Sequence, residues 1–191
     1  MNRIQNWFIY HFPKICDAKM KILKIWTENE CIKSIDSFVS KYENDTISVK
    51  DTNLFFKALF GFIYRSKAGD PNEDIHELWE NIQTDIEEFG SMLFCIEVWE
   101  SQFKLIIQID QNNILVGEYE GIYEPVENFN HSSWISFTPG CQMKMMRGGL
   151  IQEPDLTRND CRINGLVKIV TRPRSWIQDL FSIMNSSPMA V

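Results

Sequence analysis

The sequence predicts an α+β protein, with N-terminal helices packed on one face of a mostly antiparallel sheet. Up to residue 90 the apolar residues recur at helical spacing, and from residue 91 they alternate with polar residues. These two spacings are typical of amphipathic helices and of half-buried strands. Because helices and strands are segregated along the chain, the helices are expected to cover one face of a single sheet. We expect about four or five N-terminal helices, about six strands and one C-terminal helix.

Local signals place the first three helices. A first turn or two in 4–11 ends at Pro13, and apolar residues in 15–26 favour a second helix. Thr27 and Glu30 then form a T-x-x-E capping box, a pattern that marks the start of a helix. The third helix therefore begins after Thr27 and continues to about residue 42.

Two further helices complete the N-terminal part. Residues 51–66 are apolar on nearly every side, which predicts a buried central helix. The helix over 70–90 is the best bounded, because Asp70 can cap it, Pro71 suits its first turn and Gly90 can end it.

Alternating apolar residues predict the sheet. Three runs joined by the short turns "ESQ" and "DQNN" predict a three-strand meander. Three more strands are expected after a loop that contains Pro125. The expected strands are 94–98, 103–109, 114 onward, 134–137, 141–147 and 161–172.

The C-terminal part is expected to end in a helix. This helix follows Pro173 and has an apolar face, and the tail 187–191 should fray. We expect a single domain over 1–191, with its helical part in 1–90 and the sheet and final helix in 91–186. At 191 residues, with 44% hydrophobic and 24% charged residues, the chain can bury the core of one globular domain.

Several features favour a cytoplasmic location. The five cysteines are an odd number and form no CxxC pair, which is typical of reduced thiols. The sequence shows no secretory leader and no apolar run long enough to cross a bilayer, so no membrane partner is expected.

The charge is unevenly distributed. The net charge is −7, and residues 70–127 hold fifteen acidic residues against Lys104 as the one basic residue. Our leading hypothesis is a non-enzymatic interaction or regulatory protein that docks on a basic surface of a partner protein, such as an inhibitor, immunity-type protein or viral accessory factor. The candidate docking residues are Glu73, Asp74, Glu77, Glu80, Glu87, Glu88, Glu118 and Glu120.

A second hypothesis concerns the basic C-terminal part. If 141–147 and 161–172 are neighbouring strands, their basic side chains gather on one sheet face, which could bind nucleic acid or another anion. The candidate residues are Lys144, Arg147, Arg162, Lys168, Arg172 and Arg174.

A third hypothesis is a divalent-metal phosphodiesterase that uses Asp110, Glu118 and Glu120. The lysine usually found two residues after the second acid is absent, which weakens this interpretation.

Other signals for chemistry are isolated. His76 and Glu80 match only part of the HExxH zinc pattern, and a set of His131, Cys141 and Cys161 fits no motif spacing.

The sequence also has no P-loop, no GxGxxG and no GxSxG. We therefore expect no catalytic residue, no cofactor and no metal, and the sequence favours a protein that is not an enzyme.

Overall fold

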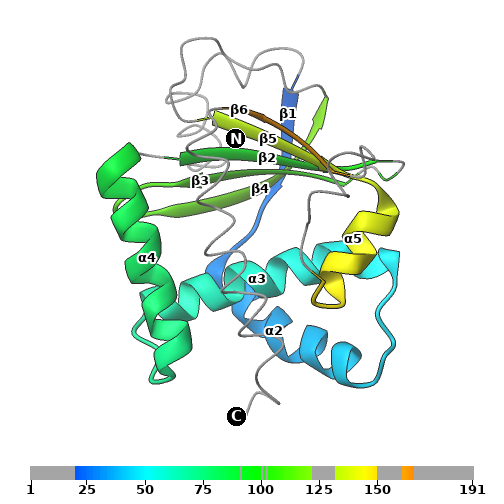
Figure 1. The fold of residues 1–191 in the computed structure, drawn as a ribbon, viewed down its shortest axis with the longest axis horizontal. Helices are drawn as coiled ribbons and strands as arrows, with labels where there is room; N and C mark the ends of the chain where they lie inside the picture. Colours follow the sequence, from blue (N-terminus) through cyan, green and yellow to red (C-terminus); the bar gives the residue numbers. More distant parts are fainter. Residues whose placement is uncertain are drawn as a thin grey trace.

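A computed structural model describes residues 20–90, 92–99, 101, 103–121, 132–149 and 161–165. Within these ranges the protein has four α-helices, one short 3-10 helix and a six-stranded sheet, which confirms the α+β prediction (Figure 1). The elements are β1 (Met20–Ile25), α2 (Glu28–Glu43), η1 (Val49–Asp51), α3 (Thr52–Lys67), α4 (Glu73–Phe89), β2 (Met92–Val98), β3 (Lys104–Ile109), β4 (Ile114–Gly121), β5 (Ser132–Phe137), α5 (Pro139–Met146) and β6 (Cys161–Gly165).

The sheet has the strand order β1-β4-β3-β2-β5-β6. β2, β3 and β4 form the predicted antiparallel meander, and β2 and β5 are the one parallel pair among the described strands. The helices α2, α3, α4 and α5 all lie on the same side of this sheet (Figure 1). The predicted one-sided helical layer is therefore present.

Helix α2 begins with the predicted capping box. The Glu30 amide donates to Thr27 Oγ1 at 3.2 Å, and the Thr27 amide donates to Glu30 Oε2 at 3.1 Å. Two amides of the first turn, which have no partner within a helix, are thereby satisfied.

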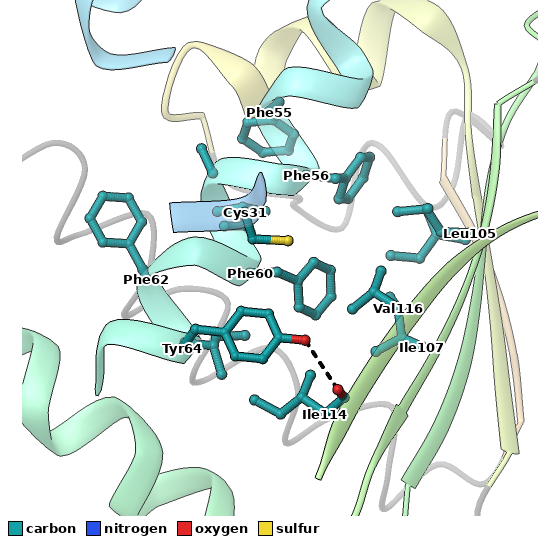
Figure 2. Packing of buried hydrophobic residues seen from close by; sticks show 14 of the residues in the cluster. Cys31, Phe55, Phe56, Phe60, Phe62, Tyr64, Leu105, Ile107, Ile114 and Val116 are labelled. Atoms are coloured by element: carbon teal, nitrogen blue, oxygen red, sulfur yellow. Dashed lines mark hydrogen bonds between the residues drawn. The ribbon is translucent and has the colours of Figure 1, made fainter. Parts of the chain in front are cut away.

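Helix α3 is the predicted central helix and contributes more residues to the core than any other described element. Phe56 and Phe60 face Leu105 and Val116 of the sheet (Figure 2). The Tyr64 hydroxyl donates to the carbonyl of Ile114 at 3.1 Å, so the one polar atom of this buried ring has a partner.

Helix α4 begins two residues later than the sequence suggested. The Asp70 side chain accepts from the Asn72 amide at 3.0 Å and pairs with Arg65 at 2.6 Å, while the Asn72 carbonyl accepts from the His76 amide. The helix therefore starts at Glu73. Gly90 ends it as predicted, with a φ of 77° that favours glycine.

Two predicted elements are wrong. The second helix, expected in 15–26, is replaced at its C-terminal end by β1, in which Met20 pairs with Gly121 and Ile25 with Gly117 of β4. The expected strand 141–147 lies instead in α5, because Thr138 Oγ1 caps the helix by accepting from the Cys141 amide and Pro139 occupies its first position.

Several predictions lie outside the described residues. These are the helix in 4–11, residues 166–172 of the last expected strand, the helix after Pro173 and the tail 187–191. The single-domain organisation stays a prediction. None of the described helices has the length and apolar composition needed to cross a membrane.

Candidate functional site

The two faces of the sheet have different surroundings. Side chains alternate between the faces along each strand, so Leu105 and Ile107 lie on the helical face while Ile106 lies on the other. We use the term second face for Leu93 and Cys95 of β2, Ile106 and Gln108 of β3, Tyr119 of β4 and Ser136 of β5. The alternation and the strand register place these six on the side away from α2, α3, α4 and α5.

The second face is apolar and shielded from solvent. Leu93, Cys95, Ile106 and Tyr119 are each at most 1% exposed, although the described helices all lie on the opposite side of the sheet. A Cβ added at Gly117 would lie 3.6 Å from Cγ2 of both Ile106 and Ile22, so the apolar surface continues toward the edge strand β1. This face is therefore a second buried layer of the protein.

A polar group of three side chains lies at one end of the second face. The Tyr119 hydroxyl donates to Glu97 Oε1 at 2.9 Å, and Lys104 Nζ lies 3.2 Å from the same oxygen. Lys104 Nζ also donates to the Gly121 carbonyl at 2.6 Å. Burial raises the pKa of Tyr119 well above its usual value, so its hydroxyl remains a donor. The positive charge of Lys104 and the negative charge of Glu97 compensate each other at this end of the second face.

Two buried polar atoms of the second face have no hydrogen-bond partner among the residues the structure describes. They are Gln108 Oε1 and Ser136 Oγ, on side chains that are 4% and 0% exposed. A buried polar atom without a partner costs about 1–3 kcal/mol, so such atoms are uncommon and call for an explanation. Binding of a polar group from a ligand is one such explanation.

The strand register fixes where these two atoms lie. Gln108 of β3 pairs with Leu93 of β2, and Ser136 of β5 pairs with Glu97 of β2. Gln108 and Ser136 therefore lie on opposite sides of β2, and their positions along the strand direction differ by four residues. With standard strand dimensions their Cα atoms are roughly 16 Å apart. Cys95 lies midway between them on β2.

None of these residues was a candidate in the sequence. The available signal was a single polar residue inside an apolar strand, Gln108 in "LIIQI" and Ser136 in "WISF". Such a residue is usually the solvent-facing member of an alternating strand. Only the burial of both faces shows that Gln108 and Ser136 are enclosed.

The acidic docking residues do not form one surface. Glu118 Oε1 accepts from Trp26 Nε1 at 2.6 Å and from Asn53 Nδ2 at 3.0 Å, and Glu120 pairs with Lys21 at 3.3 Å. Glu118 is therefore part of the internal contact between β1, α3 and β4.

The remaining acidic candidates belong to α4, at the other end of α3. The described side chains Glu77, Glu80, Glu87 and Glu88 are exposed, and Glu73 and Asp74 belong to the first turn. Helix α4 contacts α3 at Ser66, which accepts from the Trp79 amide at 2.7 Å. Ser66 lies thirteen residues after Asn53, or about 20 Å along the helix axis.

The basic candidates are also not brought together as predicted. Lys144 belongs to α5 and the exposed Arg147 caps its C-terminal end, whereas Arg162 belongs to β6. Because β6 pairs with β5, the predicted pairing of strands 141–147 and 161–172 is wrong. Lys168, Arg172 and Arg174 lie outside the described residues.

The proposed metal triad is wrong as well. Asp110 Oδ1 accepts from the amides of Asn112 and Asn113 at 2.9 and 2.8 Å, so it stabilises the β3–β4 turn. Glu118 and Glu120 lie near the opposite end of the hairpin, beside β1.

The described residues do not support the other candidate metal sites either. No group of three or more metal-binding side chains occurs within the described ranges. His76 Nε2 lies 3.5 Å from Glu80 on an exposed side of α4. Cys141 is buried, and His131 lies outside the described residues.

Comparisons with known proteins give weak similarities. No protein-family model matches the sequence, and no curated protein matches it. A solved structure named UbiJ-SCP2 ubiquinone synthesis protein has a TM-score of 0.35 and 9% identity, over 56% of this chain and 78% of the other. Sterol carrier protein 2 like 2 from Aedes aegypti has a TM-score of 0.32 and 10% identity, over 53% of this chain and 94% of the other.

The prediction of an interaction or regulatory protein is wrong. The physical reason lies in this chain itself, because Glu118 is used for internal hydrogen bonds and the acids lie in two separate places. The host–virus and accessory-factor interpretations are corrected with it.

Proposed function

We propose that this protein binds a small apolar molecule on the second face of its sheet. The observation that carries the proposal is a shielded apolar surface that holds two buried polar atoms, Gln108 Oε1 and Ser136 Oγ, without a described partner. Sites for small molecules are mostly apolar and contain a few placed polar groups that orient the ligand. The second face has both properties.

The division of the sheet supports this assignment. The helical face is filled by the core of α2, α3, α4 and α5, where the Tyr64 hydroxyl has a hydrogen-bond partner but both polar side-chain atoms of Gln142 have none in the described structure. The second face combines apolar side chains with unpartnered acceptors, an arrangement that lowers the stability of the protein alone. A bound molecule with polar groups would remove that cost.

The names of the two similar structures refer to ubiquinone synthesis and to sterol carriage, both of which concern apolar molecules. At these TM-scores the likeness adds no weight, and the proposal depends on the second face alone. The cytoplasmic location also remains a proposal, supported by the buried Cys31, which forms no disulfide.

A fluorescence titration with the neutral apolar dye N-phenylnaphthylamine tests the proposal. The dye should bind the intact protein with enhanced emission. Ile106→Val removes one methyl group from the second face and should weaken binding about fourfold, as expected for about 0.8 kcal/mol of lost contact.

Ile107→Val is the matched control. Ile106 and Ile107 are adjacent in β3, are 0% and 3% exposed, and point to opposite faces. Both variants should lose about 0.5–1.5 kcal/mol of stability, but only Ile106→Val should weaken dye binding. The proposal is wrong if the dye does not bind, or if the two variants weaken its binding equally.

A further inference from the structure

We infer that the ligand of the second face is an elongated apolar molecule with a hydrogen-bonding group at each end, one of them a donor that Gln108 accepts. This inference rests on the proposed function and adds the chemical class of the ligand. It follows from the positions of Gln108, Cys95 and Ser136 across three neighbouring strands.

The Gln108 end defines the first polar group. The unpartnered atom is the side-chain oxygen Oε1, an acceptor, on a side chain that is 4% exposed. An acceptor needs a donor such as a hydroxyl or an amide N–H, whereas a carboxylate would place two acceptors against each other. The ligand group at this end is therefore a donor.

The Ser136 end defines the second polar group. Ser136 is fully buried, and its hydroxyl can either donate or accept. In the sheet register it stands beside Glu97 of β2. This end of the second face is therefore polar, and Glu97 is already held by Tyr119 and Lys104. Ser136 Oγ remains as a hydrogen-bonding atom for a ligand.

Apolar side chains lie between the two ends. Cys95 is midway on the diagonal from Gln108 to Ser136, and Ile106 flanks it on β3, both 0% exposed. The two ends are separated by roughly 16 Å at the Cα atoms, given standard strand dimensions. A ligand that reaches both polar atoms must therefore have a long apolar body.

Competition against N-phenylnaphthylamine tests this inference. Dodecanediol, with a hydroxyl at each end, should displace the dye about tenfold better than dodecanol, because a site built to bond a hydroxyl rejects an analogue that lacks it. Gln108→Met and Ser136→Ala should each reduce the affinity for the diol to that for dodecanol, with both alcohols measured as competitors on the same variant.

Gln142→Met is the matched control for Gln108→Met. Gln142 is also a fully buried amide without a described partner, but it belongs to α5 in the helical layer. This variant should keep the preference for the diol. All three variants remove unpartnered buried atoms and should melt no lower than the wild type, which confirms that they fold.

The outcomes separate the two proposals. If the dye binds but the diol and dodecanol compete equally, or if both second-face variants keep the preference, the inference is overturned while the proposed function stands. If the dye does not bind the wild-type protein, the proposed function fails and the inference fails with it.

Discussion

Gly61 of α3 lies directly against the backbone of Cys31 in α2. A Cβ at Gly61 would stand 2.5 Å from the Cys31 carbonyl oxygen and 2.9 Å from Cγ1 of Ile35. Two helices can approach this closely only where one has no side chain. The contact sets the packing of the helical layer on which the sheet rests.

Gly61→Ala should therefore destabilise the protein. In an ordinary helix interior this change stabilises, because alanine has the higher helix propensity. Here the added methyl group meets backbone atoms that cannot rotate away, so we expect a loss of about 1–3 kcal/mol in urea denaturation. Gly140→Ala in α5 is the control, because a Cβ there meets only Thr138 Oγ1 at 3.9 Å. An equal effect at both glycines would show that the close approach is not what matters.

Glu30 should make stability depend on acid pH. Its hydrogen bond from Lys24 Nζ, at 2.6 Å, and that from the Thr27 amide lower its pKa from 4.5 to about 2. Because the folded pKa is depressed, the stabilisation is complete above the unfolded value of 4.5 and is lost as the pH falls from 4.5 toward 2. Glu30→Gln should lower the melting temperature at neutral pH and flatten its decline in this window.

Glu28→Gln is the control for this prediction. Glu28 is exposed in the same first turn of α2, so it shares the favourable interaction with the helix N-terminus. Melting curves collected across the acid range should show the flattening for Glu30→Gln alone. A similar change at Glu28 would indicate a general helix-dipole effect in place of the specific contact with Lys24.

The parts of the fold that were predicted correctly depend on local chemistry. Thr27 and Glu30 are three residues apart, so their capping box is visible in the sequence. Gly90 ends α4 through its own φ of 77°. The β3–β4 turn is likewise encoded in four consecutive residues, in which Asp110 accepts from the two asparagine amides.

The wrong predictions concern mainly segments whose structure depends on contacts with residues far away in the sequence. Residues Met20–Ile25 form a strand because they pair with β4, about a hundred residues later. The methionines of 141–147 can be read as alternating, but the Thr138–Pro139 cap determines a helix. The second face could not be predicted, because only the strand register places Gln108 and Ser136 on it and only the folded chain buries them.

Glu118 should contribute to stability through Trp26 and Asn53. Glu118→Ala leaves the indole N–H and the Asn53 amide without their acceptor, so we expect a loss of about 1–3 kcal/mol. Glu118→Gln keeps an acceptor and should recover part of this loss. Glu120→Ala is the control on the same strand. Its pair with Lys21 is exposed on both sides, and its removal should change the free energy of unfolding by less than about 0.5 kcal/mol.

Gln142 should be a site where an apolar substitution stabilises the protein. Its side chain is 0% exposed, and both Oε1 and Nε2 lack a hydrogen-bond partner in the described structure. Methionine has a similar length and no group that requires a partner. Gln142→Met should therefore raise the free energy of unfolding by about 1–3 kcal/mol, measured by urea denaturation. Gln142→Glu should do the opposite, because a buried carboxylate costs more than a buried amide. A destabilised Gln142→Met variant would show that the amide has a polar partner in the folded protein.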